Sequence, residues 1–120
     1  MSSYYQIFLR APEVGERLLS DIAGAAGVEL SSSSTSGGGI DFAGGADTVK
    51  VQVELSHEFD DDYGIPFSQY PVVVTVIDLE RSAAREEVLA RDVFNKLAEA
   101  GIYSMLFVHD LSVLIDRADP

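Results

Sequence analysis

Five acidic residues lie close together in the middle of the chain, and three aromatic residues follow them. The acidic residues are Glu54, Glu58, Asp60, Asp61 and Asp62. The aromatic residues are Tyr63, Phe67 and Tyr70. A dense negative charge accelerates the encounter with a positively charged protein, and aromatic side chains supply contact area at interfaces. We therefore predict a partner-binding site at these residues, with a solvated acidic loop that serves only solubility as the alternative.

The same carboxylates raise a third interpretation, a divalent-cation site. A calcium-binding loop needs acids at alternate positions, then a glycine, then a distant glutamate. Here Gly64 falls out of step and Gln69 stands in the terminal position. We predict no metal and no other cofactor.

The charge of the chain is concentrated around this stretch. The 120 residues include 20 acidic and 8 basic side chains, for a net charge of −12. Residues 51–80 contain seven acids and no base, whereas residues 1–50 carry a net −3 and residues 81–120 a net −2. Such a field repels phosphate and anionic lipid, so we expect a basic protein as partner, and neither nucleic acid nor a membrane.

The two histidines and the glycine run do not form a recognisable catalytic set. His57 adjoins Glu58, but strand alternation places the two side chains on opposite faces, so we expect the backbone to satisfy His57. His109 and Asp110 are neighbours in a predicted turn, a poor geometry for a dyad. Gly37–Gly39 lacks the spacing of a phosphate-binding loop and no helical pattern follows it. We predict no catalytic residues.

Composition indicates one soluble domain over residues 1–120. Hydrophobic residues make up 47% of the chain, enough to build a core. There is no cysteine, so disulfide scaffolds and zinc fingers are excluded. The start of the chain does not resemble a signal peptide, and the apolar run from Val72 to Ile77 is too short to span a membrane. We expect a cytoplasmic location.

The first half of the chain predicts a strand, a helix and a flexible loop. Tyr4–Leu9 alternates like a strand. A helix is expected from Ala11-Pro12 to Gly27, because apolar residues recur there every three or four positions. The Ser/Gly tract 31–39 is expected to be a flexible loop. A short edge strand at Ile40 and Phe42 and a turn at residues 44–47 follow.

The second half predicts two strands, a helix and a closing strand or hairpin. Residues 48–59 alternate as a half-buried strand, while Val72–Leu79 is apolar on both faces and should be central. A helix follows, capped by Ser82 and ended by Gly101. Residues 102–108 and 111–115 are expected to form two short strands or one bulged strand.

This order predicts an α+β fold of the ferredoxin-like βαββαβ type, with two helices on one face of an antiparallel sheet and a possible extra C-terminal strand. Apolar residues on both faces of several strands indicate that the helix-free face is covered. A second copy of the chain would cover it, forming a homodimer; the Ser/Gly loop with the C-terminal strand is the alternative.

The residues favour a non-catalytic acidic binding module, such as an inhibitor or immunity-type protein that docks onto a basic partner. The alternative is a small-molecule-binding or catalytic homodimer, whose cleft would be lined by His57, Tyr63 or Tyr103.

Overall fold

A computed structural model describes residues 4–32 and 40–120 of the chain. The strands are β1 (Tyr5–Arg10), β2 (Ser31–Ser32), β3 (Phe42–Ala46), β4 (Val49–Glu54), β5 (Val72–Asp78), β6 (Ser104–His109) and β7 (Val113–Ala118). The helices are α1 (Glu16–Ala26), α2 (Ala83–Glu99) and the short 3-10 helix η1 (Phe67–Gln69).

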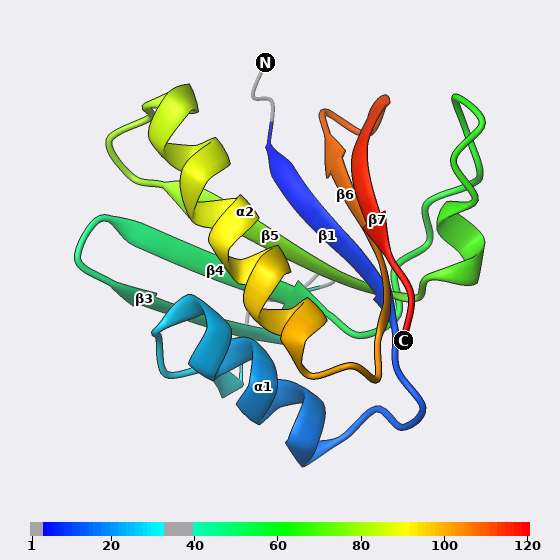
Figure 1. Ribbon diagram of the computed structural model, residues 1–120. Coiled ribbons are helices and arrows are strands. Elements are labelled where there is room, and N and C mark those ends of the chain that lie inside the picture. The colour runs from blue at the N-terminus through cyan, green and yellow to red at the C-terminus, as the bar shows by residue number, and fades with distance from the viewer. Residues whose placement is uncertain (1–3, 33–39) are drawn as a thin grey trace.

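The strands form one antiparallel sheet in the order β2-β3-β4-β5-β1-β6-β7. Both α-helices lie across the same face of this sheet (Figure 1). The α+β class and a strand beyond β6 at the C-terminus are therefore confirmed. The ferredoxin-like βαββαβ topology is not matched, because the sheet has seven strands in a different order: β2 and β3 extend one edge and β7 the other.

Strand β3 lies where it does because its backbone passes close to the backbone of Glu29 at Gly44. A Cβ atom built at Gly44 would lie 2.0 Å from the carbonyl oxygen of Glu29, so only glycine fits while the chain passes this close. Residues 42–46 can then pair with β4, and the chain turns at Asp47 and Thr48, not within the glycines as we expected.

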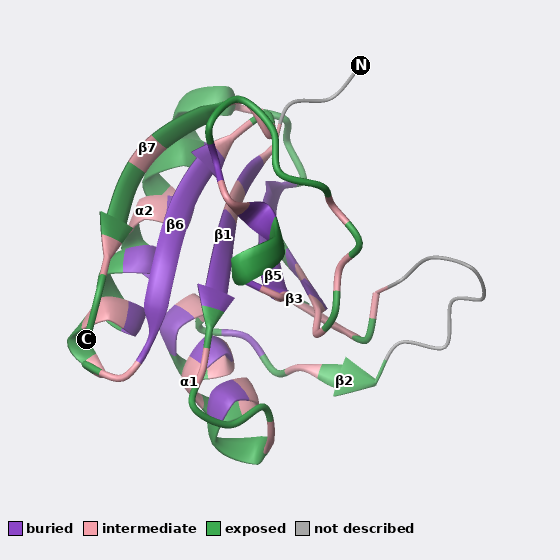
Figure 2. Ribbon diagram, turned by 90° about the vertical axis from the view of Figure 1, so that its right-hand side faces the viewer, coloured by how far each residue is buried: buried purple, intermediate pink, exposed green. Residues whose placement is uncertain are grey.

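The larger core lies between the sheet and the two helices. On α1 the buried residues Leu18, Ile22 and Ala25 recur at helical spacing. They pack in one cluster with the helix-facing side chains of β1, β4, β5 and β6 and with the buried face of α2. All seven residues of β5 are buried, which confirms its predicted central position (Figure 2).

The helix-free face of the sheet has a second, smaller core. Four side chains project from this face: Phe8, Val73, Leu106 and Val108. They are covered by residues 55–71, which connect β4 to β5 and which we call the covering segment. Its residues Ile65, Phe67 and Tyr70 pack on the sheet, with Phe59 beside them. We had expected a second copy, or the Ser/Gly loop with the C-terminal strand, to cover these residues. The homodimer remains a prediction, but burial of these side chains no longer requires it.

Three predicted boundaries differ from the structure. Helix α1 begins at Glu16, not at Ala11-Pro12, because glycine disfavours a helix interior and Gly15 stands as an extended N-cap. Strand β4 ends at Glu54, not Phe59. The predicted flexible loop covered residues 31–39. Ser31–Ser32 forms β2 instead, and residues 33–39, which include the glycine run, lie outside the described residues.

Helix α2 and the final strands follow the prediction more closely. The Ser82 side chain caps α2 by accepting a hydrogen bond from the backbone N–H of Arg85 at 3.3 Å. Gly101 follows the helix with a left-handed φ of 73°. Strands β6 and β7 form a hairpin with an irregularity at Phe107 and Val108, so two strands are present and not one.

Candidate functional site

The five predicted carboxylates lie on the acidic segment, which we define as residues 54–63, where the chain leaves β4. Asp41 sets this exit, because its Oδ2 accepts the backbone N–H of Leu55 at 2.7 Å in place of a sheet partner. Glu58, Asp60, Asp61 and Asp62 are exposed, and Glu54 is partly buried. The structure thus presents most of this charge to solvent.

The remaining acids of residues 51–80 have structural roles. Asp78 is fully buried, and its Oδ2 accepts the backbone N–H of Ser82 at 2.8 Å. Glu80 forms an ion pair with Arg85 at 2.7 Å. Among the described residues, by contrast, no lysine or arginine forms an ion pair with any of the five predicted carboxylates. These five therefore form the uncompensated part of the charge concentration.

A tight turn at the end of the acidic segment presents Tyr63 to solvent. Asp62 and Ile65 exchange two backbone hydrogen bonds, of 3.2 Å and 2.7 Å, across the central residues Tyr63 and Gly64. Both central residues have positive φ, 50° and 73°, as a type I′ turn requires. Asparagine and glycine are the usual residues there, and a tyrosine in the left-handed region is strained. Its side chain is 71% exposed.

The other two predicted aromatic contacts are in the core. Phe67 is 1% exposed and Tyr70 is 5% exposed. The ring of Phe67 lies 4.7 Å from that of Phe8 on β1, and the guanidinium of Arg10 lies 5.4 Å from the Tyr70 ring. Phe67 and Tyr70 therefore hold the segment to the sheet, and of the three aromatics only Tyr63 is available to a partner.

Two of the aspartates are themselves held by the backbone. Asp61 Oδ1 accepts the N–H of Ser68 at 2.8 Å, and Asp62 Oδ1 accepts the N–H of Tyr63 at 2.9 Å. The bond from Ser68 stabilises the ionised carboxylate and holds the pKa of Asp61 below its usual value. The charge at this position therefore persists to lower pH than that of an ordinary aspartate.

His57 is satisfied by the backbone, as we predicted, although not within a strand. Its Nδ1 accepts the N–H of Phe59 at 3.0 Å, so Nε2 carries the hydrogen and donates to the carbonyl oxygen of Tyr70 at 2.6 Å. Its ring packs edge-on against Phe8. Because both nitrogens are occupied, His57 joins the two ends of the covering segment and is not free to transfer a proton. His109 stacks on the ring of Tyr5 at 4.3 Å.

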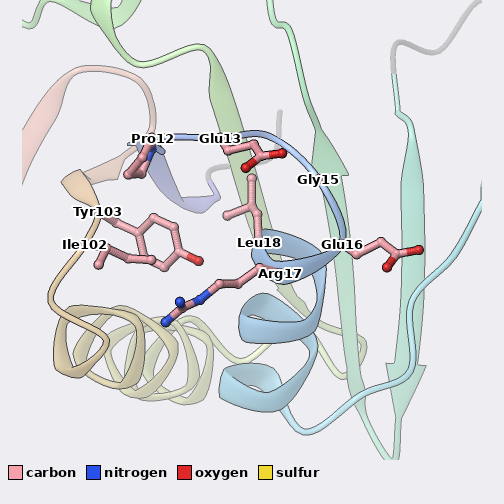
Figure 3. Close-up of a pocket in the computed structure, with 8 residues that line it drawn as sticks. All are labelled: Pro12, Glu13, Gly15, Glu16, Arg17, Leu18, Ile102 and Tyr103. Carbon is pink, nitrogen blue, oxygen red and sulfur yellow. The ribbon is translucent and has the colours of Figure 1, made fainter.

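A candidate ligand cavity lies elsewhere, between the start of α1 and the start of β6. Its volume is about 540 Å³ (Figure 3). Pro12, Leu18, Ile102 and the Tyr103 ring form its apolar wall, and Glu13, Glu16 and Arg17 bring charges to its rim. Sites for small molecules have volumes of roughly 300–1,000 Å³, so this cavity is large enough for one.

The chemistry of this cavity does not favour catalysis. Tyr103 Oη donates a 2.5 Å hydrogen bond to Asp21 Oδ2, and Arg17 Nε lies 3.6 Å from the same oxygen. Burial, with the bond to Asp21 second, raises the pKa of Tyr103 to about 12. The phenol therefore stays protonated at neutral pH and cannot act as a base. The described lining residues include no serine, threonine, cysteine or histidine, so they form no hydroxyl or thiol nucleophile paired with a histidine base.

A pair of buried carboxylates was not predicted. Glu86 is 3% exposed, and its Oε2 accepts the backbone N–H of Asp78 at 2.9 Å. Arg85 Nη1 lies 3.6 Å from Asp78 Oδ1, which has no hydrogen-bond partner. The only available signal was the position of Asp78 at the end of a strand that is otherwise apolar except for Thr75. These residues tie the start of α2 to the end of β5.

No group of three or more His, Asp or Glu side chains in the described ranges converges to hold a metal ion. None of the helices formed by residues 4–32 and 40–120 is long and apolar enough to cross a membrane. Comparison of the chain with protein-family models, with curated proteins and with solved structures found no match.

Proposed function

We propose that the chain is a non-catalytic docking module that binds a basic protein through the acidic segment. The observation that supports this most is the set of five carboxylates without ion pairs, presented beside an exposed, strained tyrosine. Strained residues persist where the surroundings hold them, and they cluster at functional sites. An inhibitor or immunity-type protein that neutralises a cationic enzyme fits these properties.

The rigid attachment of the segment supports the same proposal. A loop that is ordered before binding loses less conformational entropy when its partner docks. Here Phe67 of η1 is buried in the second core, and His57 hydrogen bonds to Phe59 within the acidic segment and to Tyr70 beyond it. The cationic partner would meet a fixed arrangement of charge with Tyr63 at its tip.

The test begins with retention of proteins from the source cells on the immobilised chain at low salt, followed by elution with a salt gradient. The eluted partner is then measured against a variant with Asp60→Asn, Asp61→Asn and Asp62→Asn. Asparagine keeps the side-chain oxygens that accept from Ser68 and Tyr63, so the loop is retained. We expect the association rate at low salt to fall by about tenfold, since electrostatic steering acts on this rate.

The matched control removes three charges elsewhere. Glu16, Glu29 and Glu99 are exposed and have no ion pair among the described residues, and their change to glutamine alters the net charge equally. This control should keep nearly the wild-type rate. An equal loss of association rate in both variants would show that only the net charge matters, and not the acidic segment. A partner bound equally well at high and low salt would refute the proposal.

A second candidate function is small-molecule binding in the cavity of Figure 3, for which its volume of about 540 Å³ is the supporting observation. A fragment library titrated into the labelled protein should then shift the amide resonances of Ile102 and Tyr103 in a saturable way. The absence of any saturable shift there would remove this candidate.

A further inference from the structure

Part of the helix-free face has a row of polar side chains across the three central strands. The register pairs Gln52 on β4 with Thr75 on β5, and Thr75 with Gln6 on β1. Gln6 Nε2 donates to Thr75 Oγ1 at 3.0 Å, which leaves the Gln6 carbonyl oxygen available as an acceptor. Within the described chain, the Gln52 side chain makes no hydrogen bond. The Gln52 side chain and the Gln6 carbonyl oxygen are thus polar groups at the centre of the sheet that no described residue engages, and they are available to a ligand.

These residues line a small, half-enclosed pocket of about 160 Å³. Glu54 and Val73, which face each other in the register, form one end, and Ile40 forms a side wall. The pocket adjoins the second core, because Val73 also packs there beneath the covering segment. Sites for drug-sized ligands start at roughly 300 Å³, so this pocket is suited to a single side chain.

The charge of this pocket is negative and uncompensated. None of the described residues that line it is positively charged, and no lysine or arginine of the described chain pairs with Glu54, nor with Asp41 or Glu58 beside it. Burial chiefly raises the pKa of Glu54, and the nearby Asp41 and Glu58 raise it further, against a lowering effect of His57. A cation placed here would stabilise a carboxylate that is at present partly desolvated and crowded by like charge.

A cation at the other end of the pocket is already engaged. Tyr4 lines that end, and the guanidinium of Arg81 lies 5.3 Å from the centre of its ring. Tyr4 and Glu54 are well separated along the strands, because Tyr5 pairs with Val76 whereas Glu54 pairs with Val73. Arg81 therefore does not substitute for a cation at Glu54.

We propose that this pocket receives an arginine side chain of the basic partner. The guanidinium carries five N–H donors in a planar fork, and it suits several separated acceptors better than the compact ammonium of lysine. The acceptors here are the Glu54 carboxylate and the side-chain oxygens of Gln6, Gln52 and Thr75. This inference rests on the proposed function, because it names the chemistry that the docked partner would present beside the acidic segment.

The test is a titration of the full chain with N-acetyl-arginine amide, followed by NMR. We expect saturable shifts at Gln6, Gln52, Glu54 and Thr75. The uncharged analogue N-acetyl-citrulline amide should cause no such shifts, and the lysine analogue should bind more weakly. Equal binding of the citrulline or lysine analogue, or shifts confined to residues 58–63, would overturn the inference.

Two variants test where the arginine analogue binds, and a third variant serves as the control. Glu54→Gln removes the charge and keeps the shape, so the arginine analogue should bind about tenfold more weakly, as charge-assisted hydrogen bonds are the strong ones. Gln52→Leu removes an acceptor that no described residue uses, and should weaken binding by a smaller factor. Glu99→Gln, remote from the pocket, should leave binding unchanged; an equal effect of Glu99→Gln would overturn the inference.

The outcomes separate this inference from the proposed function. One outcome is that the partner binds with the salt dependence expected of Asp60, Asp61 and Asp62, but the arginine analogue does not bind in the pocket. In that case only the pocket inference is wrong. If the pocket binds the analogue through Glu54 but the aspartate variant leaves partner association unchanged, the docking role of the acidic segment is wrong.

Discussion

Replacing Tyr63 with asparagine should stabilise the protein while weakening its binding to the partner. Tyr63 has a left-handed φ of 50° at the first central position of a two-residue turn, and Gly64 has 73° at the second. The change produces Asn-Gly, the pair most favoured in a type I′ turn. The tyrosine side chain is 71% exposed, so its removal sacrifices little packing.

The magnitude follows from the backbone. A residue with a Cβ atom loses about 1–2 kcal/mol in the left-handed conformation, and asparagine loses less because its side chain hydrogen bonds locally. We therefore expect Tyr63→Asn to raise the free energy of unfolding by about 1 kcal/mol. With a urea m-value of about 2 kcal/mol/M, the midpoint should rise by about 0.5 M. Tyr63→Ala keeps a Cβ atom at the same φ, and its midpoint should stay close to that of the wild type.

The assay is equilibrium unfolding in urea, monitored by circular dichroism, for the wild type and both variants. The same three proteins are then compared for partner affinity, which both variants should reduce, because the aromatic anchor is lost. A fall in the midpoint of Tyr63→Asn would show that the tyrosine stabilises the turn, and the argument from strain would be wrong. Unchanged partner affinity in both variants would remove Tyr63 from the docking site.

Three further changes test the supporting structure. Phe67→Ala should lower the free energy of unfolding by about 3–5 kcal/mol in urea titrations, because it empties a filled core position; a loss below about 1 kcal/mol would contradict its burial. Tyr103 has its folded pKa raised to about 12 from 10.0, so the native state binds more protons between these values. The free energy of unfolding should therefore be intact below pH 10 and fall as pH rises toward 12, by at most about 3 kcal/mol. Tyr103→Phe, which also loses the bond to Asp21, should reduce this fall in stability in alkaline unfolding curves. Tyr5, whose pKa is also raised chiefly by burial, accounts for what remains, and an unchanged fall would contradict the role of Tyr103. Glu86→Ala should cost about 1–3 kcal/mol by leaving the N–H of Asp78 without a partner, and Glu86→Gln should cost less in the same measurement.

Local sequence patterns were sufficient to predict the elements that depend on neighbouring residues. The apolar run of β5 and the Ser82 cap of α2 are such patterns, and both are confirmed. The end of β4 is different. Alternation continues past Glu54, but the strand stops because the carboxylate of Asp41, fourteen residues before Leu55, accepts the N–H of Leu55. No pattern within the strand contains that information.

The candidate site likewise combines features that the local sequence predicts with features that depend on distant residues. The concentration of charge at residues 54–62 is visible in the sequence. The burial of Phe67 and Tyr70 depends on Phe8, which is distant in the chain, and composition cannot separate such anchors from exposed aromatics like Tyr63. The polar row at Gln6, Gln52 and Thr75 exists only because three strands pair in one register.

In the covering segment, the residues that pack in the second core differ from the exposed residues of the proposed docking site, although the two sets lie only a few positions apart. Phe59, Ile65, Phe67 and Tyr70 pack in the second core, whereas Asp60–Tyr63 are exposed. In the described chain, a side-chain hydrogen bond that leaves this exposed group joins Asp61 to the N–H of Ser68. Mutations at these four exposed positions should therefore be tolerated by the fold. Under the proposed docking function, changes at these exposed positions alone would alter the choice of partner, and we expect sequence divergence among related chains to be greatest there.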